Sequence, residues 1–213
     1  MSVLRIDATI QADRSASSAL ADRVLSAFAA SHPDVPVVRR HLGQDPLPAH
    51  LWEPAVSAGY VPEPDRTPVQ REALATAQLL ADELRQATGA VLALPLYNYG
   101  ISQHAKTWID LAVAGAPYGD RLLDGTPTVL VTTRGGAYGA GTPREGWDHN
   151  TEYLRRILVD TWGADLTVVE REFTLVGVNP ALDEFTELAA LLHKAADEAA
   201  HDAGTALADR HAA

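Results

Sequence analysis

Three polar segments of the chain carry the residue types best suited to hold a small ligand. The first combines Arg14 with the hydroxyls of Ser15 and Ser17, just before an amphipathic stretch. Hydroxyls and free N–H groups at the start of a helix favour an anion, and an arginine adds a full positive charge. Taken alone, however, the segment is more simply interpreted as a serine helix cap with solvated neighbours.

The second segment, Pro95 to Ser102, reads PLYNYGIS and follows an unbroken apolar run. Two tyrosines and an asparagine after a buried strand offer a flat apolar wall with amide donors and acceptors beside it. Such a wall suits a planar heteroaromatic ring. A tight turn whose aromatic rings pack on the core explains the same pattern equally well.

The third segment is Thr133-Arg134-Gly135-Gly136. Consecutive glycines let the backbone approach a ligand closely and direct N–H groups towards it. Donors aimed at the N1/C2=O edge of a ring stabilise the negative charge that gathers there on reduction. The alternative is a flexible glycine-rich loop, since more glycines follow.

Several other chemistries find no support in the sequence. The first strand is followed neither by a Walker lysine nor by G-x-G-x-x-G, and the chain has no G-x-S-x-G, which argues against P-loop, dinucleotide-Rossmann and α/β-hydrolase sites. Cysteine is absent, which excludes disulfides, thiolate metal sites and a cysteine nucleophile. Asp148-His149-Asn150 lacks a second histidine at helical spacing, so it predicts a helix start, and no metal site is expected.

Strand and helix patterns alternate along the chain. Apolar runs predict strands, and 3.6-residue periodicity predicts helices. The strands are expected at Val3–Ala8, Val35–Arg39, Ala90–Pro95, Thr128–Thr133 and Leu166–Glu170, and the helices at Ser17–Ala30, Pro68–Ala87, Ser102–Ala114, Asn150–Trp162 and Leu182–Ala208. We therefore predict one α/β domain over residues 1–213, a doubly wound, flavodoxin-like parallel sheet in the order 2-1-3-4-5 with helices on both faces.

This architecture brings the three polar segments together at the carboxyl ends of the strands, which is where open parallel sheets bind their ligands.

Gln44 to Pro68 is rich in proline and is expected to be irregular, serving as a functional or interface segment. The positive charge of Arg14 is expected to offset Asp7, which lies close to the first polar segment.

Charge and hydropathy narrow the choice of partners. The chain has 17 basic and 28 acidic residues, a net charge of −11, which disfavours nucleic acid as a partner. No apolar run approaches membrane-spanning length, and no leader pattern is seen at the start. We expect a cytoplasmic protein without a membrane partner.

Together, the three segments resemble the FMN-dependent NADH-azoreductase and quinone-reductase family of flavodoxin-like flavoproteins. The family's aromatic–asparagine stretch stands here as Pro95–Ser102, its S/T-R-G-G stretch as Thr133–Gly136, and its S-x-S phosphate segment as Ser15–Ser17. The resemblance covers nearly the whole chain, in the family's order.

The resemblance implies a homodimer with FMN near its interface, NADH or NADPH as reductant, and a planar aromatic acceptor such as a quinone or azo compound, used by a ping-pong route. It implies no acid–base residue, because the flavin carries the chemistry. A specialised biosynthetic flavoenzyme and a non-catalytic flavin-binding electron carrier are the alternatives. The residues implied to bind FMN are Thr9, Arg14, Ser15, Ala16, Ser17, Pro95, Leu96, Tyr97, Asn98, Tyr99, Thr133, Arg134, Gly135 and Gly136, and those implied to contact the acceptor are Tyr118, Tyr138 and Asp160.

Three features depart from the family pattern. Ala8 stands where a hydroxyl is usual, next to the acidic Asp7. The loop over residues 137–149 is lengthened, and Asp160 lies in a helix with more charge than the family pattern has. The last two features bear on the acceptor rather than on the flavin.

Overall fold

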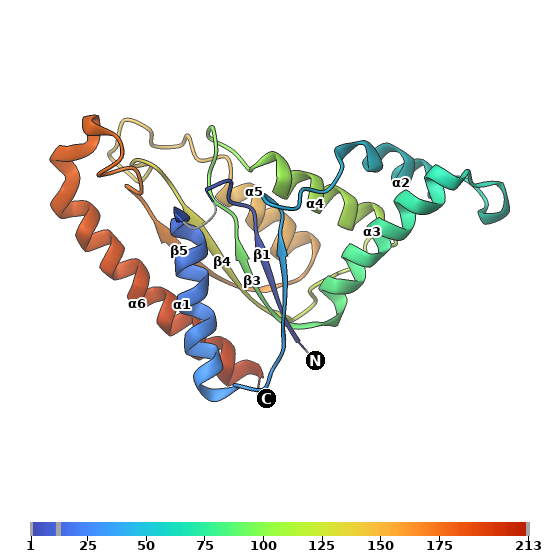
Figure 1. The fold of residues 1–213 in the computed structure, drawn as a ribbon, viewed down its shortest axis with the longest axis horizontal. Helices are drawn as coiled ribbons and strands as arrows, with labels where there is room; N and C mark the ends of the chain where they lie inside the picture. The colour runs from blue at the N-terminus through green and yellow to red at the C-terminus, as the bar shows by residue number, and fades with distance from the viewer. Residues whose placement is uncertain (1, 12–13, 212–213) are drawn as a thin grey trace.

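One parallel sheet forms the centre of the computed structural model, which describes residues 2–11 and 14–211 (Figure 1). Its strands run in the order β2-β1-β3-β4-β5, which confirms the predicted doubly wound, flavodoxin-like topology. The strands are β1 (Ser2–Asp7), β2 (Val37–His41), β3 (Ala87–Ala93), β4 (Pro127–Thr133) and β5 (Asp165–Arg171).

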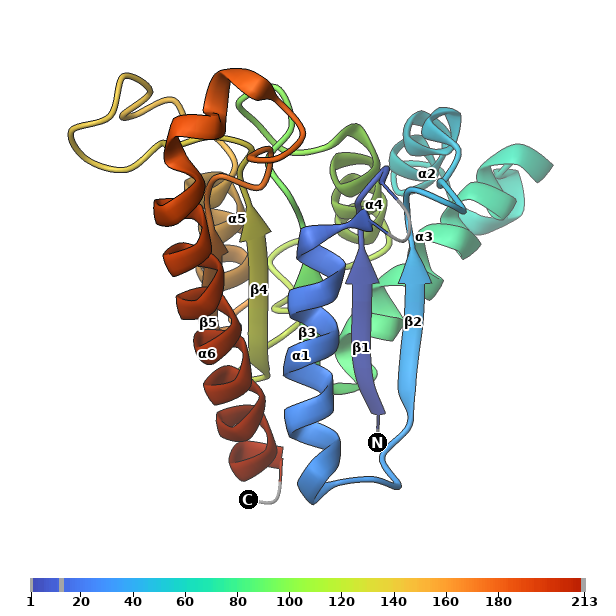
Figure 2. The same cartoon turned by 60° about the vertical axis from the view of Figure 1, so that its left-hand side comes forward.

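Helices cover both faces of this sheet. On one face lie α1 (Ala16–Ser31) and α6 (Thr186–His211), which stand in front of the strands in Figure 2. On the other face lie α3 (Pro68–Gln86), α4 (Gln103–Ala114) and α5 (Thr151–Arg155). A π-helical segment, η4 (Arg156–Thr161), continues α5.

The alternation of side chains along each strand builds two cores. Val91 and Val129 pack into the cluster beneath α1 and α6, whereas their neighbours Leu92 and Leu130 pack into the cluster beneath α3 and α4. Successive strand residues point to opposite faces, so a strand covered on both sides needs an unbroken apolar run. The runs in the sequence meet this requirement.

Helix starts follow the capping residues in the sequence. Thr67 and Gln70 form a reciprocal capping box at α3, with Pro68 at its first position, and the Ser102 side chain accepts a hydrogen bond from the Ala105 N–H at α4. These caps confirm the predicted starts of both helices.

The segment between β2 and α3 is more regular than its prolines suggest. It contains α2 (Trp52–Ala58), flanked by the short 3-10 helices η2 (Ala49–Leu51) and η3 (Glu63–Asp65). Apart from Pro46, its prolines lie at helix caps or in first turns, where a missing N–H costs little. The expectation of irregular structure was therefore wrong. The helix expected at Asn150–Trp162 is present, as a short α-helix continued by a π-helix.

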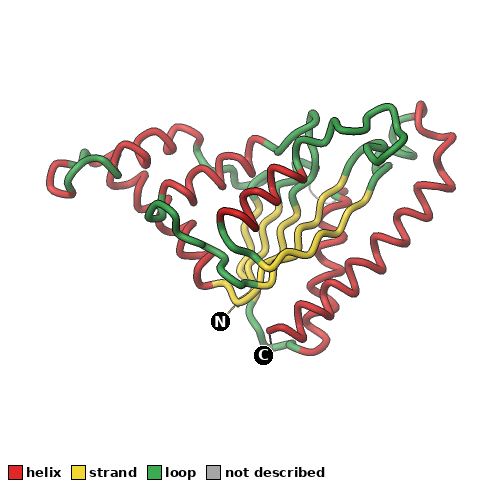
Figure 3. Tube along the Cα trace, turned by 180° about the vertical axis from the view of Figure 1, so that it is seen from behind, coloured by secondary structure: helices red, strands yellow, loops and turns green. Residues whose placement is uncertain are grey.

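The loops that follow β1, β3 and β4 gather at the carboxyl edge of the sheet, above the arrowheads in Figure 2 and among the green segments of Figure 3. The topology thus places the three polar segments side by side. Within residues 2–11 and 14–211, no helix is both long enough and apolar enough to cross a membrane.

Candidate functional site

A cavity of about 290 Å³ opens at this carboxyl edge. Its walls come from the loops after β1, β3 and β4, with a further wall from the segment after β5. Most of the residues singled out in the sequence line it, namely Thr9, Ser15, Ala16, Ser17, Pro95, Leu96, Tyr97, Asn98, Thr133, Gly135, Gly136 and Tyr138.

One end of the cavity is the N-terminus of α1. Ser15 is the N-cap, and its Oγ accepts a hydrogen bond from the Ser18 N–H at 3.2 Å. The Ser17 hydroxyl lies 3.0 Å from the Ser15 hydroxyl, and both side chains are buried. A 16-residue helix directs its free N–H groups and positive dipole end here, so this end of the cavity suits an anion.

The opposite wall is built on a tight turn. Tyr97 and Gly100 exchange both backbone hydrogen bonds at 3.0 Å, and the two residues between them, Asn98 and Tyr99, have φ values of 47° and 69°. Asparagine tolerates this left-handed region, whereas a tyrosine there is uncommon. The turn leaves Leu96, Tyr97 and Asn98 on the cavity.

Tyr99 is placed differently from the other residues of this turn. Its ring packs edge-on against Trp147 with ring centroids 5.5 Å apart, and it does not line the cavity. The Tyr97 hydroxyl instead reaches the first loop, where it accepts a hydrogen bond from the Ile10 N–H at 3.2 Å. The first and second polar segments are therefore fixed to each other.

Gly135 packs closely against the segment after β5. A Cβ atom at this position would lie 2.6 Å from the Leu175 Cδ1, and the Leu175 N–H donates to the Gly135 carbonyl at 3.2 Å. The sequence analysis missed this fourth wall, which consists of Thr174, Leu175, Asn179 and Leu182. The rule that ligands lie at the carboxyl edge applies to β5 as well, and this was the available signal.

Arg134 lies beneath the cavity rather than in it. Its side chain is 9% exposed and bonds to Asp148, to the Thr151 hydroxyl at 3.0 Å and to Glu170 at 2.9 Å. Burial lowers the pKa of Arg134, but the hydrogen bonds and charges of Glu170 and Asp148 raise it overall. A guanidinium with its donors occupied in this way fixes the loop and is not available to a ligand.

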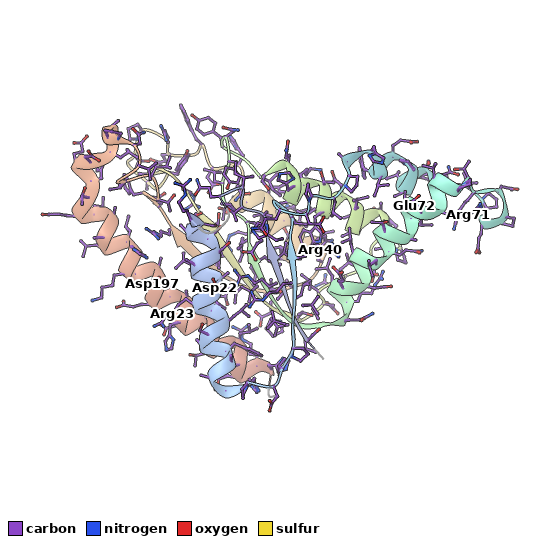
Figure 4. The ribbon with its side chains drawn as sticks, viewed as in Figure 1. Asp22, Arg23, Arg40, Arg71, Glu72 and Asp197 are labelled. Atoms are coloured by element: carbon purple, nitrogen blue, oxygen red, sulfur yellow. The ribbon has the colours of Figure 1, made fainter. Side chains whose placement is uncertain are left out.

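The charge of Asp7 is also neutralised from below. Arg5 donates to both Asp7 oxygens, at 2.7 and 3.1 Å, and also pairs with Asp22. Asp22 lies on α1, where Figure 4 labels it. Ser18 donates a further hydrogen bond to Asp7 at 2.7 Å. The expectation that Arg14 offsets Asp7 was therefore wrong, because Arg5 on the same strand does so, and Arg14 is exposed and outside the cavity lining.

Two of the three residues expected to contact the acceptor lie elsewhere. Tyr118 is fully exposed, and it shares with Asp160 a separate groove of about 1020 Å³ between α2, α4 and η4. Asp160 forms an ion pair with Arg156 at 2.8 Å. Only Tyr138 faces the cavity at the carboxyl edge of this chain.

The sequence analysis also missed Gln11 and Arg144, which line the cavity. The Arg144 guanidinium lies 5.6 Å from the centroid of the Tyr138 ring. Among residues 2–11 and 14–211, no cluster of three histidine, aspartate or glutamate side chains is placed to hold a metal ion.

Comparison with known proteins agrees with this fold. A family model described as the flavodoxin-like fold matches residues 1–197. A protein of Frankia alni named FMN-dependent NADH:quinone oxidoreductase is 36% identical over 191 residues, covering 87% of this chain and 90% of its own. One of the same name from Streptomyces avermitilis is 35% identical, covering 99% of both chains.

Solved structures share the fold. An azoreductase from Bacillus anthracis str. Sterne has a TM-score of 0.77 at 23% identity, covering 97% of this chain and 100% of its own. An FMN-dependent NADH-azoreductase from Bacillus anthracis str. Ames Ancestor, in complex with FMN, has a TM-score of 0.70 at 19% identity, covering 96% and 100%. The fold and site define a flavodoxin-like protein. The chain belongs to the family of the FMN-dependent NADH:quinone oxidoreductases.

Asp148 gives the buried network under the cavity a testable pH dependence. Burial by itself would raise the pKa of Asp148, but hydrogen bonds from Thr151 and Asn150 and the charge of Arg134 hold that pKa below its usual value. A depressed folded-state pKa stabilises the fold above the unfolded value of about 3.9. This contribution is lost as the pH falls through the folded-state pKa.

We predict that Asp148→Asn lowers the free energy of unfolding by about 1–3 kcal/mol at pH 7, because it removes a charged, hydrogen-bonded group. The difference from the parent should begin to shrink near pH 4, where Asp148 binds a proton in the unfolded state, and should disappear once the pH has fallen through the lower folded-state pKa. Urea unfolding at several pH values measures both effects. The control is Asp124→Asn, which removes an exposed ion pair with Arg121 and should change stability by less than about 1 kcal/mol. A pH-independent difference for Asp148→Asn would contradict this account.

Proposed function

We propose that this protein is an FMN-dependent oxidoreductase that passes a hydride from NADH or NADPH, through FMN, to a planar conjugated acceptor such as a quinone or an azo compound. The observation that carries the proposal is one cavity with an anion-binding helix start at one end and a flat wall with paired glycines at the other. The names of the relatives, which specify FMN, NADH and quinone, support it.

The donor set fits FMN. The N-terminus of α1, with Ser15, Ala16 and Ser17, would hold the phosphate, and the flavin ring would lie against Pro95–Asn98. Thr133, Gly135 and Gly136 would meet its pyrimidine edge, and Thr9 lies between the two ends. When bound, FMN supplies a group that accepts and returns a hydride.

The chain's own residues prepare the site for that chemistry. The bidentate bond from Arg5 removes most of the repulsion between Asp7 and a nearby phosphate. The Tyr97 hydroxyl fixes the distance between the phosphate end and the ring wall. Backbone N–H groups of Gly135 and Gly136 would stabilise negative charge on the ring edge without reorganising. One open face would then serve donor and acceptor in turn.

We also propose a homodimer in which the groove between α2, α4 and η4 faces the second subunit. Trp52, Tyr60 and Tyr118 line this groove with large exposed aromatic side chains. A monomer seldom leaves such an apolar patch in water. On this proposal, Tyr118 and Asp160 act at the cavity of the partner subunit rather than at that of their own chain.

The function is tested by anaerobic spectroscopy of the purified protein with bound FMN. NADH should bleach the flavin absorbance, and a quinone added afterwards should restore it. Two-substrate kinetics should give parallel lines, since donor and acceptor use the same face in turn. Bleaching without reoxidation by any quinone or azo compound would favour the specialised biosynthetic enzyme. Slow bleaching with fast exchange to a protein acceptor would favour the electron carrier.

The phosphate site predicts a specific loss for Ser17→Ala. FMN affinity should fall about tenfold or more, the range for a hydrogen bond to a charged group, whereas affinity for riboflavin, which lacks the phosphate, should stay unchanged. Fluorescence titration measures both. Arg14→Ala serves as the control and should bind FMN nearly as well as the parent, because Arg14 lies outside the cavity. An equal loss for FMN and riboflavin would show that Ser17 does not contact the phosphate.

For the homodimer, Tyr60→Glu should shift the protein from dimer towards monomer, because it places a charge in a desolvated interface. Sedimentation at micromolar concentration measures the shift. Leu191→Glu is the control, since Leu191 is 67% exposed on α6, away from the groove. A parent protein that sediments as a monomer would overturn the assignment of this face.

A further inference from the structure

Arg144 is the one charged side chain among the described residues that line the cavity. It lies on the glycine-rich loop after β4, over residues 137–149. This loop returns to the edge of the sheet, where the Tyr138 N–H donates to Glu172 at 2.7 Å and the His149 N–H donates to the Tyr99 carbonyl at 2.9 Å. The loop is thus attached at both ends.

The Arg144 guanidinium is held against the ring-binding wall. It stacks on Tyr138 at 5.6 Å, and its Nη1 lies 3.1 Å from the point where a Cβ of Gly136 would stand. A cation over a tyrosine face is attracted by the negative charge of that face. The absence of a side chain at Gly136 lets the guanidinium approach the wall itself.

The donors of Arg144 remain available. Arg5 and Arg134 are each bonded to two or more acidic side chains, whereas no carboxylate in residues 2–11 and 14–211 pairs with Arg144. The neighbouring Glu145 carboxylate accepts the Gly141 N–H at 2.8 Å and forms no ion pair with Arg144. A planar, unpaired guanidinium offers two parallel donors, which match a carboxylate or a sulfonate.

Charge gives this arrangement a consequence for selectivity. With a net charge of −11, the protein repels an anionic aromatic molecule, and a cation at the cavity reverses that effect locally. We propose that Arg144 makes the enzyme selective for aromatic acceptors that carry a carboxylate or sulfonate on the ring. This inference rests on the proposed function and specifies the class of acceptor.

The position of Arg144 favours the acceptor over two other anions. The phosphate of FMN already has a site at Ser15 and Ser17, at the start of α1. The pyrophosphate of NADH is separated from the nicotinamide by a ribose, whereas Arg144 lies directly at the ring wall beside Gly136. An acid attached to the ring itself reaches that point.

The experiment compares a matched pair of acceptors, 1,2-naphthoquinone and 1,2-naphthoquinone-4-sulfonate, in the reoxidation of NADH-reduced enzyme by stopped flow. For each variant, the rate constant with the sulfonated quinone is divided by that with the neutral quinone. The difference in intrinsic reactivity between the two quinones is the same for all variants, so it cancels when these ratios are compared. In Arg144→Gln this ratio should fall about tenfold or more, and Arg144→Lys should retain part of it.

Two further measurements control the result. Arg23→Gln removes the same charge from an exposed position on α1, away from the loops (Figure 4), and should leave the ratio unchanged. Benzoate binding to the oxidised enzyme, followed by the flavin spectrum, should weaken in Arg144→Gln by a similar factor. This second readout needs no turnover, so it tests Arg144 even if the parent fails to oxidise NADH and the proposed function is wrong.

Three results would overturn the inference. An unchanged ratio with unchanged benzoate affinity would mean that Arg144 faces solvent. A slower reduction by NADH at an unchanged ratio would assign the guanidinium to the pyrophosphate instead. A loss of affinity for FMN but not for riboflavin would assign it to the FMN phosphate.

Discussion

The buried guanidinium of Arg134 joins the end of β4 to β5 and to the start of α5, beneath the cavity. It leaves the end of β4 and bonds to Asp148 and Thr151 at the start of α5 and to Glu170 on β5. An arginine this deeply buried is tolerated only with its donors satisfied, so these segments can meet in few ways. The paired glycines beside it are held in place as a result.

A second buried arginine, Arg5, joins β1 to α1 on the other side of the cavity. Arg5 donates to both Asp7 oxygens and reaches α1 through Asp22, so Asp7 carries little net charge towards the cavity. Both buried arginines are engaged by acidic side chains, so the positive potential in the cavity comes from the α1 N-terminus, the glycine N–H groups and Arg144. These three features divide the cavity into an anion end, a ring wall and a charged rim.

The predictable part of the site came from local patterns. The positions of serine hydroxyls before a helix and of an asparagine in a tight turn can be predicted from the sequence. Helix capping and left-handed backbone depend on residues that are near in the chain. Ser15, Ser17 and Asn98 therefore line the cavity as the sequence suggested. Arg134 does not line the cavity. Whether an arginine contacts a ligand or forms ion pairs depends on acidic residues that are distant in sequence, here Asp148 and Glu170.

The sequence by itself determined the parallel sheet, its strand order and the edge where the site lies, since apolar periodicity and right-handed crossovers leave few alternatives. Only the tertiary structure decided which charges face the cavity. The partner of Asp7 is Arg5, where the sequence analysis expected Arg14. The arginine that lines the cavity at the ring wall is Arg144, where the sequence analysis expected Arg134. Tyr118 and Asp160 lie in a separate groove for the same reason. The direction of a long side chain is set by packing and by partners that cannot be predicted from the local sequence.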